Sequence, residues 1–188
     1  MKRADSITFL AMRRILIIGC PGSGKSTLSR ALGVHTELPI IHLDQEYFGP
    51  DWQEMPRPEW RQRVEELVAH DRWIMDGNYA GTLASRLAHA DLVIYLTPSP
   101  LTCLYRVLKR IVRWRGRVRP DAAPGCKERF DFDFLHYILT FRFHSARRVA
   151  RLLAAHPTVP VIRGARINAA EVLAHVGFRA KGVRPAKR

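Results

Sequence analysis

Short apolar runs alternate with amphipathic stretches along most of the chain. Five runs are rich in β-branched or other large apolar residues and are short enough to predict strands, at residues 14–18, 38–44, 72–77, 92–96 and 159–163. A strand that is apolar at nearly every position is typical of a parallel sheet with both faces covered. The alternation therefore predicts an α/β domain in which helices pack on both faces of a parallel sheet.

Apolar residues at helical spacing lie between these predicted strands. The clearest pattern places Trp60, Val64 and Leu67 on one helical face. Other helical patterns cover residues 26–32, 83–88, 99–114, 128–155 and 168–176. Residues 47–58 contain glycine and prolines that favour a loop.

The length of 188 residues predicts a single domain, which we place at residues 12–180. We expect residues 1–11 to be an extension before a working start at Met12, and residues 181–188 to be a basic tail. No run approaches 18 apolar residues, so we expect no membrane span. The three cysteines form no C-x-x-C pair, which predicts neither a zinc site nor a disulfide framework and suits a reducing cytoplasm.

Residues 19–26, Gly-Cys-Pro-Gly-Ser-Gly-Lys-Ser, match the phosphate-binding pattern G-x-x-x-x-G-K-[ST]. The predicted strand before it and a helical pattern after it supply the context that the motif requires. In such a loop, backbone N–H groups surround phosphate oxygens, the lysine contacts the outer phosphates, and the hydroxyl binds Mg²⁺. The sequence therefore predicts ATP and Mg²⁺ as cofactors, held by Gly19, Pro21, Gly22, Ser23, Gly24, Lys25, Ser26 and Thr27.

Two carboxylates lie where predicted strands end, and ligands of parallel sheets bind beyond these carboxyl ends. Asp76 is the candidate that holds Mg²⁺ through water beside Ser26, and a turn-forming role is its alternative. Asp44 is the candidate base or orienting group for a hydroxyl acceptor. Its alternatives are a second acid near the metal or a helix or turn cap. His42 is expected on the other face of its strand, in the core.

Six arginines gather after the fourth predicted strand, namely Arg106, Arg110, Arg113, Arg115, Arg117 and Arg119. We interpret them as a helical, arginine-rich lid at about residues 114–128. Because an arginine can stabilise the transferred phosphoryl group, Arg110 and Arg117 join Lys25 and Asp44 as catalytic candidates. A solvated basic face and a stripe facing nucleic acid are the alternatives. The formal charge of +14 favours polyanions, yet no nucleic-acid motif accompanies it.

Further side chains are weaker candidates for the same site. Arg86 is a candidate to reach the acceptor, and Arg142, Arg147 and Arg148 are candidates for a returning arm of the lid. Aromatic residues of the 47–58 loop line an acceptor pocket or simply pack beneath the loop; these are Tyr47, Phe48 and Trp52. A second aromatic group is expected mostly in the core, namely Phe130, Phe132, Phe134, Tyr137 and Phe141.

From Arg13 to Ile162 the chain resembles the adenylate-kinase-related P-loop proteins known as DNA topology modulation proteins. The phosphate loop, Leu-Asp44, Trp-Ile-Met-Asp-Gly-Asn-Tyr and Arg-Gly-Arg-x-Arg-Pro-Asp carry the resemblance, in that order. The resemblance implies a nucleoside-monophosphate-kinase-like P-loop NTPase, a three-layer sandwich with a five-stranded parallel sheet of order 2-3-1-4-5. It also implies a mobile lid, and it leaves the substrate open.

These features favour an enzyme that transfers phosphate from Mg-ATP to a small-molecule acceptor. The acceptor is nucleoside- or nucleotide-like, or another hydroxyl-bearing metabolite. A nucleic-acid-binding P-loop NTPase is the alternative, and a nucleotide-responsive regulator with negligible turnover is a third possibility. The chain lacks the Asn/Thr-Lys-x-Asp motif of GTPases, which favours ATP.

Overall fold

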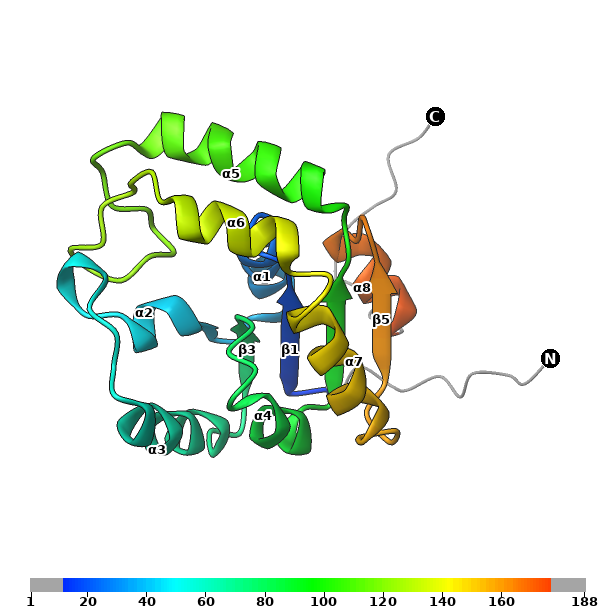
Figure 1. Ribbon diagram of the computed structural model, residues 1–188. Coiled ribbons are helices and arrows are strands. Elements are labelled where there is room, and N and C mark those ends of the chain that lie inside the picture. Colours follow the sequence, from blue (N-terminus) through cyan, green and yellow to red (C-terminus); the bar gives the residue numbers. More distant parts are fainter. Residues whose placement is uncertain (1–11, 177–188) are drawn as a thin grey trace.

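A five-stranded parallel sheet forms the centre of the protein (Figure 1). The computed structural model describes residues 12–176, so the predicted extension at 1–11 and tail at 181–188 lie outside the described residues. The strand order β2-β3-β1-β4-β5 confirms the predicted order. The strands are β1 (Arg14–Gly19), β2 (Ile40–His42), β3 (Trp73–Asp76), β4 (Leu92–Leu96) and β5 (Val161–Gly164).

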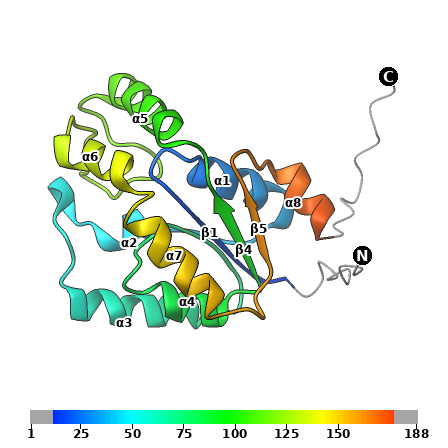
Figure 2. The same cartoon turned by 45° about the vertical axis from the view of Figure 1, so that its right-hand side comes forward.

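Helices cover both faces of the sheet, which confirms the predicted three-layer arrangement (Figure 2). On one face lie α3 (Arg57–Val68), α4 (Leu83–His89) and α7 (Ser145–Ala154). On the other lie α1 (Lys25–Thr36) and α8 (Ala169–His175). Alternate β1 side chains enter the two cores, as the pleat requires: Leu16 and Ile18 face the first, Ile15 and Ile17 the second.

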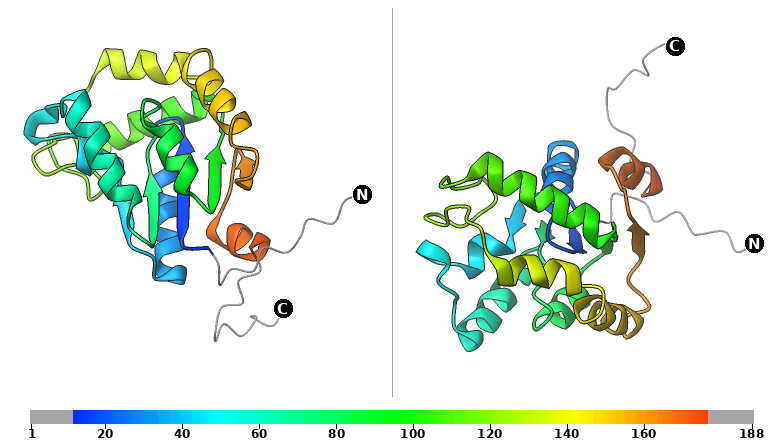
Figure 3. Two further views of the ribbon diagram at one scale, coloured as in Figure 1. Left: turned by 90° about the horizontal axis from the view of Figure 1, so that it is seen from below. Right: turned by 45° about the horizontal axis from the view of Figure 1, so that its top comes forward.

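Two further helices, α5 (Pro100–Trp114) and α6 (Phe132–Thr140), lie side by side across the carboxyl end of the sheet (Figure 3). They share a small core that includes Val107 and Ile138. The carboxyl end also carries α2 (Leu43–Tyr47) and a short 3₁₀ turn, η2 (Pro50–Trp52). No helix within residues 12–176 is long and apolar enough to cross a bilayer.

Three predicted elements need correction. The predicted helix at 128–155 is two helices, because α6 packs on the α5 core through Ile138 whereas α7 packs on the sheet through Val149. The segment expected as a helical lid contains no helix, since Gly116 turns the chain out of α5 with φ 69°. Strand β2 ends at His42, because buried Leu43 turns inward against Gly77 and begins α2.

Candidate active site

The phosphate-binding loop joins β1 to α1 and has the backbone shape that the motif requires. Gly22 and Gly24 adopt left-handed conformations, with φ 79° and 104°. A Cβ at Gly22 would lie 2.4 Å from the carbonyl oxygen of Cys103 in α5, so only glycine fits there. Lys25 Nζ donates to the carbonyl oxygens of Gly19 (3.0 Å) and Cys20 (3.3 Å). The lysine therefore lies over the loop at the amino end of α1, where anions bind.

Asp76 ends β3 beside this loop and is almost fully buried. Its carboxylate accepts from the hydroxyls of Ser29 (2.6 Å) and Ser26 (3.4 Å). Mg²⁺ prefers oxygen ligands and usually keeps several waters and substrate phosphates among them. Within residues 12–176 no group of three or more His, Cys, Asp or Glu side chains converges to hold a metal. The Ser26 and Asp76 oxygens thus fit a magnesium ion that is held mainly by nucleotide phosphates and water.

His42 does not enter the core as expected, because it contacts Asp76. It lies directly opposite Asp76 in the parallel register of β2 and β3, so both side chains point to the same face. The distance between His42 Nδ1 and the Asp76 carboxylate is 2.7 Å. Burial alone would lower the pKa of His42, but the hydrogen bond and charge of Asp76 outweigh it and raise the pKa. His42 thereby helps to fix the Asp76 carboxylate.

Arg86 is buried in α4 and does not reach the acceptor side, which corrects the prediction. Its guanidinium group donates to the carbonyl oxygens of Gly77 (3.0 Å), Tyr79 (2.9 Å) and Asn78. Burial lowers the pKa of Arg86 to about 9, so the side chain remains charged at neutral pH. Because the loop after β3 also supplies the Asn78 Oδ1 that accepts from Gly19 N (3.0 Å), Arg86 supports the phosphate-binding loop indirectly.

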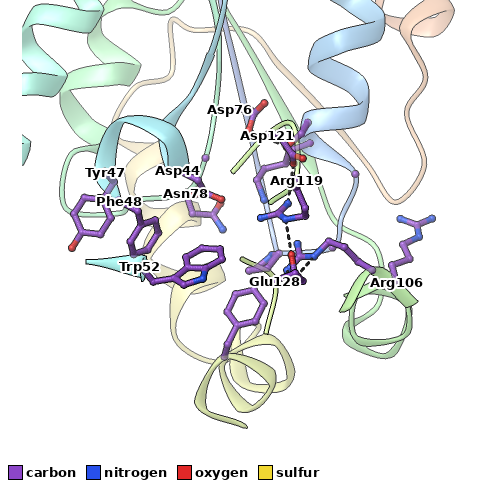
Figure 4. Close-up of a pocket in the computed structure, with 18 of the residues that line it drawn as sticks. Asp44, Tyr47, Phe48, Trp52, Asp76, Asn78, Arg106, Arg119, Asp121 and Glu128 are labelled. Carbon is purple, nitrogen blue, oxygen red and sulfur yellow. Dashed lines mark hydrogen bonds and ion pairs between the residues drawn. The ribbon is translucent and has the colours of Figure 1, made fainter. Parts of the chain in front are cut away.

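Asp44 lies in the first turn of α2 instead of ending a strand, and it lines the same cavity as the phosphate loop. The phenol of Tyr79 donates to Asp44 Oδ1 at 2.7 Å. Burial, and then the charge of Asp44, raise the pKa of Tyr79, so the phenol keeps its proton. This hydrogen bond holds the Asp44 carboxylate in one orientation toward the cavity (Figure 4).

Arg110 of α5 and Arg119 of the segment predicted as a lid meet at a buried acid that lines the cavity; Arg119 and this acid, Glu128, are labelled in Figure 4. Glu128 is only 4% exposed and pairs with Arg110 Nη2 at 2.9 Å and with Arg119 Nε at 2.6 Å. Burial, followed by the neighbouring Arg119, lowers the pKa of Arg110, and Glu128 offsets part of this effect. Arg106 lies on the nucleotide side and donates to the Ser23 carbonyl oxygen at 3.2 Å.

Arg117, a catalytic candidate from its position in the cluster, does not line the cavity and is exposed to solvent. It lies in the turn after α5, where its N–H bonds to Trp114 O and its carbonyl accepts from Glu128 N. These bonds keep the turn on the outside of the lid, so Arg119 takes the inward position instead. Other candidate arginines that are exposed and lie outside the cavity are Arg113, Arg115, Arg142, Arg147 and Arg148.

Asp121 and Glu128 are site residues that the sequence interpretation missed. Asp121 pairs with Arg119 Nη1 at 3.0 Å. Burial would raise the pKa of Asp121, but the charge of Arg119 and the nearby Ser26 hydroxyl outweigh it and lower the pKa. The sequence feature that could have identified Asp121 and Glu128 is their position as two acids within an otherwise strongly basic segment.

The cavity has a volume of about 850 Å³ and runs from the phosphate loop to α2 and α6. An aromatic wall of Tyr47, Phe48 and Trp52 lines it opposite Arg106 (Figure 4). Within the second aromatic group, Phe134 and Tyr137 line the cavity and Phe141 is buried. The prediction of core positions is wrong for three of them. Phe130 and Phe132 are 54% and 77% exposed because they precede or begin α6, and Tyr137, which faces the cavity, is 37% exposed.

Comparisons with known proteins identify the fold. No family model matches the chain, and no curated protein matches its sequence. The shikimate kinase of Acinetobacter baumannii in complex with shikimate is 20% identical, with a TM-score of 0.53 over 88% of this chain and 90% of that one. The shikimate kinase of Aquifex aeolicus is 14% identical, with a TM-score of 0.49 over 90% of this chain and 99% of that one. That of Bacteroides thetaiotaomicron is 13% identical, with a TM-score of 0.48 over 89% and 95%.

The first of these likenesses supports the predicted P-loop kinase fold. The resemblance to DNA topology modulation proteins stays a prediction.

Proposed function

We propose that the protein is a kinase that transfers the γ-phosphate of Mg-ATP to a hydroxyl group of a small molecule. The observation that carries this proposal is one cavity that the phosphate loop, Asp44 and the paired arginines Arg110 and Arg119 line together. The structural likeness to a shikimate kinase bound to shikimate, a hydroxylated ring, also supports a hydroxyl acceptor.

In this reaction the acceptor oxygen attacks the γ-phosphorus, the bond to the β–γ bridging oxygen breaks, and ADP leaves. Lys25 and the loop N–H groups would hold the triphosphate, and Ser26 and Asp76 would hold a Mg²⁺ ion, which would supply positive charge to the phosphates. Asp44 orients the hydroxyl and accepts its proton. The guanidinium groups of Arg110 and Arg119 stabilise the charge on the phosphoryl group during transfer.

A screen of metabolite pools with γ-labelled ATP, read by mass spectrometry, tests the proposal. We expect a labelled monophosphate product. Asp44→Asn should lower kcat about 100-fold or more while Mg-ATP affinity, measured by calorimetry, stays within about twofold. Lys25→Ala should abolish Mg-ATP binding without unfolding the protein. Asp71→Asn, at an exposed carboxylate outside the cavity, is the control and should change neither quantity.

Absence of any phosphorylated product, together with strong salt-dependent DNA binding, would overturn this proposal. It would favour the nucleic-acid-binding NTPase instead. The exposed arginines outside the cavity, Arg113, Arg115 and Arg117, are the residues that such an activity would use. Equal turnover by Asp44→Asn and the unaltered protein would remove Asp44 from the reaction.

A further inference from the structure

The part of the cavity lined by the aromatic wall and its neighbours has a charge pattern that selects among acceptors. We call it the acceptor end; it consists of cavity-lining residues from 44–54, 79–80 and 129–137. We infer that the acceptor is an alcohol that carries an amino group and a ring-shaped apolar face, without a carboxylate or phosphate. This inference rests on the proposed kinase function and specifies its substrate class.

The cations near the acceptor end are already paired with acids of the protein. Arg110 and Arg119 share the buried Glu128, and Arg119 also pairs with Asp121. Arg129 Nη2 lies 3.9 Å from the Asp131 carboxylate. An acceptor carboxylate that enters here would have to displace one of these partners, whereas a neutral or cationic acceptor would not.

Two carboxylates at the acceptor end lack a cationic partner. Asp44 accepts a hydrogen bond from Tyr79 at 2.7 Å, and Glu54 accepts one from the Tyr47 phenol at 2.9 Å. Between residues 12 and 176, no Lys, Arg or His nitrogen lies within 4.0 Å of either carboxylate. An ammonium group is attracted to a carboxylate that has no cationic partner, and an anion is repelled by it.

The aromatic wall of Tyr47, Phe48 and Trp52 provides the surface that would contact the ring of the acceptor. Phe48 packs edge-on against both Tyr47 and Trp52, with ring centroids 4.9 and 5.3 Å apart. Trp52 is fixed further by the hydrogen bond from its Nε1 to the Lys127 carbonyl oxygen (2.9 Å). Fixed aromatic faces bind apolar ring faces and attract cations. Together with Glu54, they favour an acceptor whose ring carries an ammonium group.

A matched series of acceptors tests this inference. Each set has the same hydroxylated ring in an amine, a neutral and a carboxylate form, for example glucosamine, glucose and glucuronate, with further sets built on cyclitols and nucleosides. We expect kcat/KM to fall from amine to neutral to carboxylate within the sets that are phosphorylated. Preference for the carboxylate form would overturn the inference and leave the kinase proposal intact. If no member of any set is phosphorylated while the metabolite pools still yield a labelled product, the inference fails and the kinase proposal stands; if the pools yield no product either, both fail.

Substitution of Glu54 tests whether this residue determines the preference for amine acceptors. Glu54→Gln should lower the amine-to-neutral ratio of kcat/KM about fivefold, as expected for one partly exposed charge pair. Glu54→Arg should reverse the order of amine and carboxylate acceptors. Glu65→Gln, on the exposed side of α3 and outside the cavity, is the matched control and should leave the ratio unchanged. An amine preference that survives Glu54→Arg would refute the role given to Glu54.

Discussion

Replacement of the buried arginine of α4, Arg86→Met, should destabilise the protein and disturb the site at a distance. The side chain is fully buried, and its guanidinium group donates to three successive carbonyl oxygens, those of Gly77, Asn78 and Tyr79. Methionine fills much of the same volume but donates no hydrogen bond. The three carbonyl groups would then lose their donor in a region with little access to water.

The expected loss of stability follows from the strength of these three hydrogen bonds. A hydrogen bond from a charged donor contributes about 1.5–3 kcal/mol. Two of the three carbonyl contacts are only partly buried, so water can replace some of the interaction, and the release of a buried charge offsets more. We therefore expect the free energy of unfolding to fall by about 3 kcal/mol, which corresponds to a Tm about 6–12 °C lower for a domain of this size.

Thermal unfolding followed by circular dichroism measures this change. Arg61→Met, on the exposed side of α3, is the control and should alter the free energy of unfolding by less than about 0.5 kcal/mol. Arg86→Lys keeps the charge but loses the forked geometry, so its Tm should lie between those of Arg86→Met and the unaltered protein. A Tm for Arg86→Met within about 2 °C of the unaltered protein would refute the reasoning, because it would mean that the three carbonyl groups need no donor.

Two further substitutions test the loop and the lid. Gly22→Ala should weaken Mg-ATP binding at least tenfold in calorimetry, because its Cβ would clash with the Cys103 carbonyl oxygen, whereas Gly81→Ala has open space and should bind normally. Unchanged affinity in Gly22→Ala would contradict the packing of the loop against α5. Arg119→Ala should lower kcat about 100-fold or more in the acceptor assay, because it removes a cation from the centre of the cavity. Arg117→Ala should lower it less than twofold, and equal losses would contradict the assignment of Arg119.

Local patterns were sufficient to predict the sheet, the phosphate loop and Asp76. Each of them depends on a contiguous run, such as the apolar residues before Gly19 or before Asp76, and the family resemblance supplied the strand order. Parallel strands bring their carboxyl ends to one edge, so the approach of Asp76 to Ser26 follows from the order of elements alone.

The inward-facing residues of the lid segment could not be predicted, because this segment has neither the helical nor the strand period of apolar residues. Helical spacing grouped Arg106, Arg110 and Arg113 on one face, and only the first two line the cavity. Beyond Trp114 the chain turns irregularly, and spacing no longer tells which arginine points inward. The choice of Arg119 over Arg117 depends on backbone bonds to Trp114 and Glu128 that appear only in the folded chain. His42 was misplaced for a related reason, since its contact with Asp76 depends on the register between two strands.

Glu128 explains how two arginines can lie close together in the cavity. Two neighbouring guanidinium groups repel each other, and the pKa of Arg110 is lowered by burial first and then by the charge of Arg119. Glu128 contacts both groups, and Asp121 contacts Arg119, so these carboxylates hold the cluster together. In the proposed reaction the γ-phosphate competes with these carboxylates for the same guanidinium groups. The arginines then change partners without a large change of position, which is the arrangement that lowers the reorganisation cost of charge stabilisation.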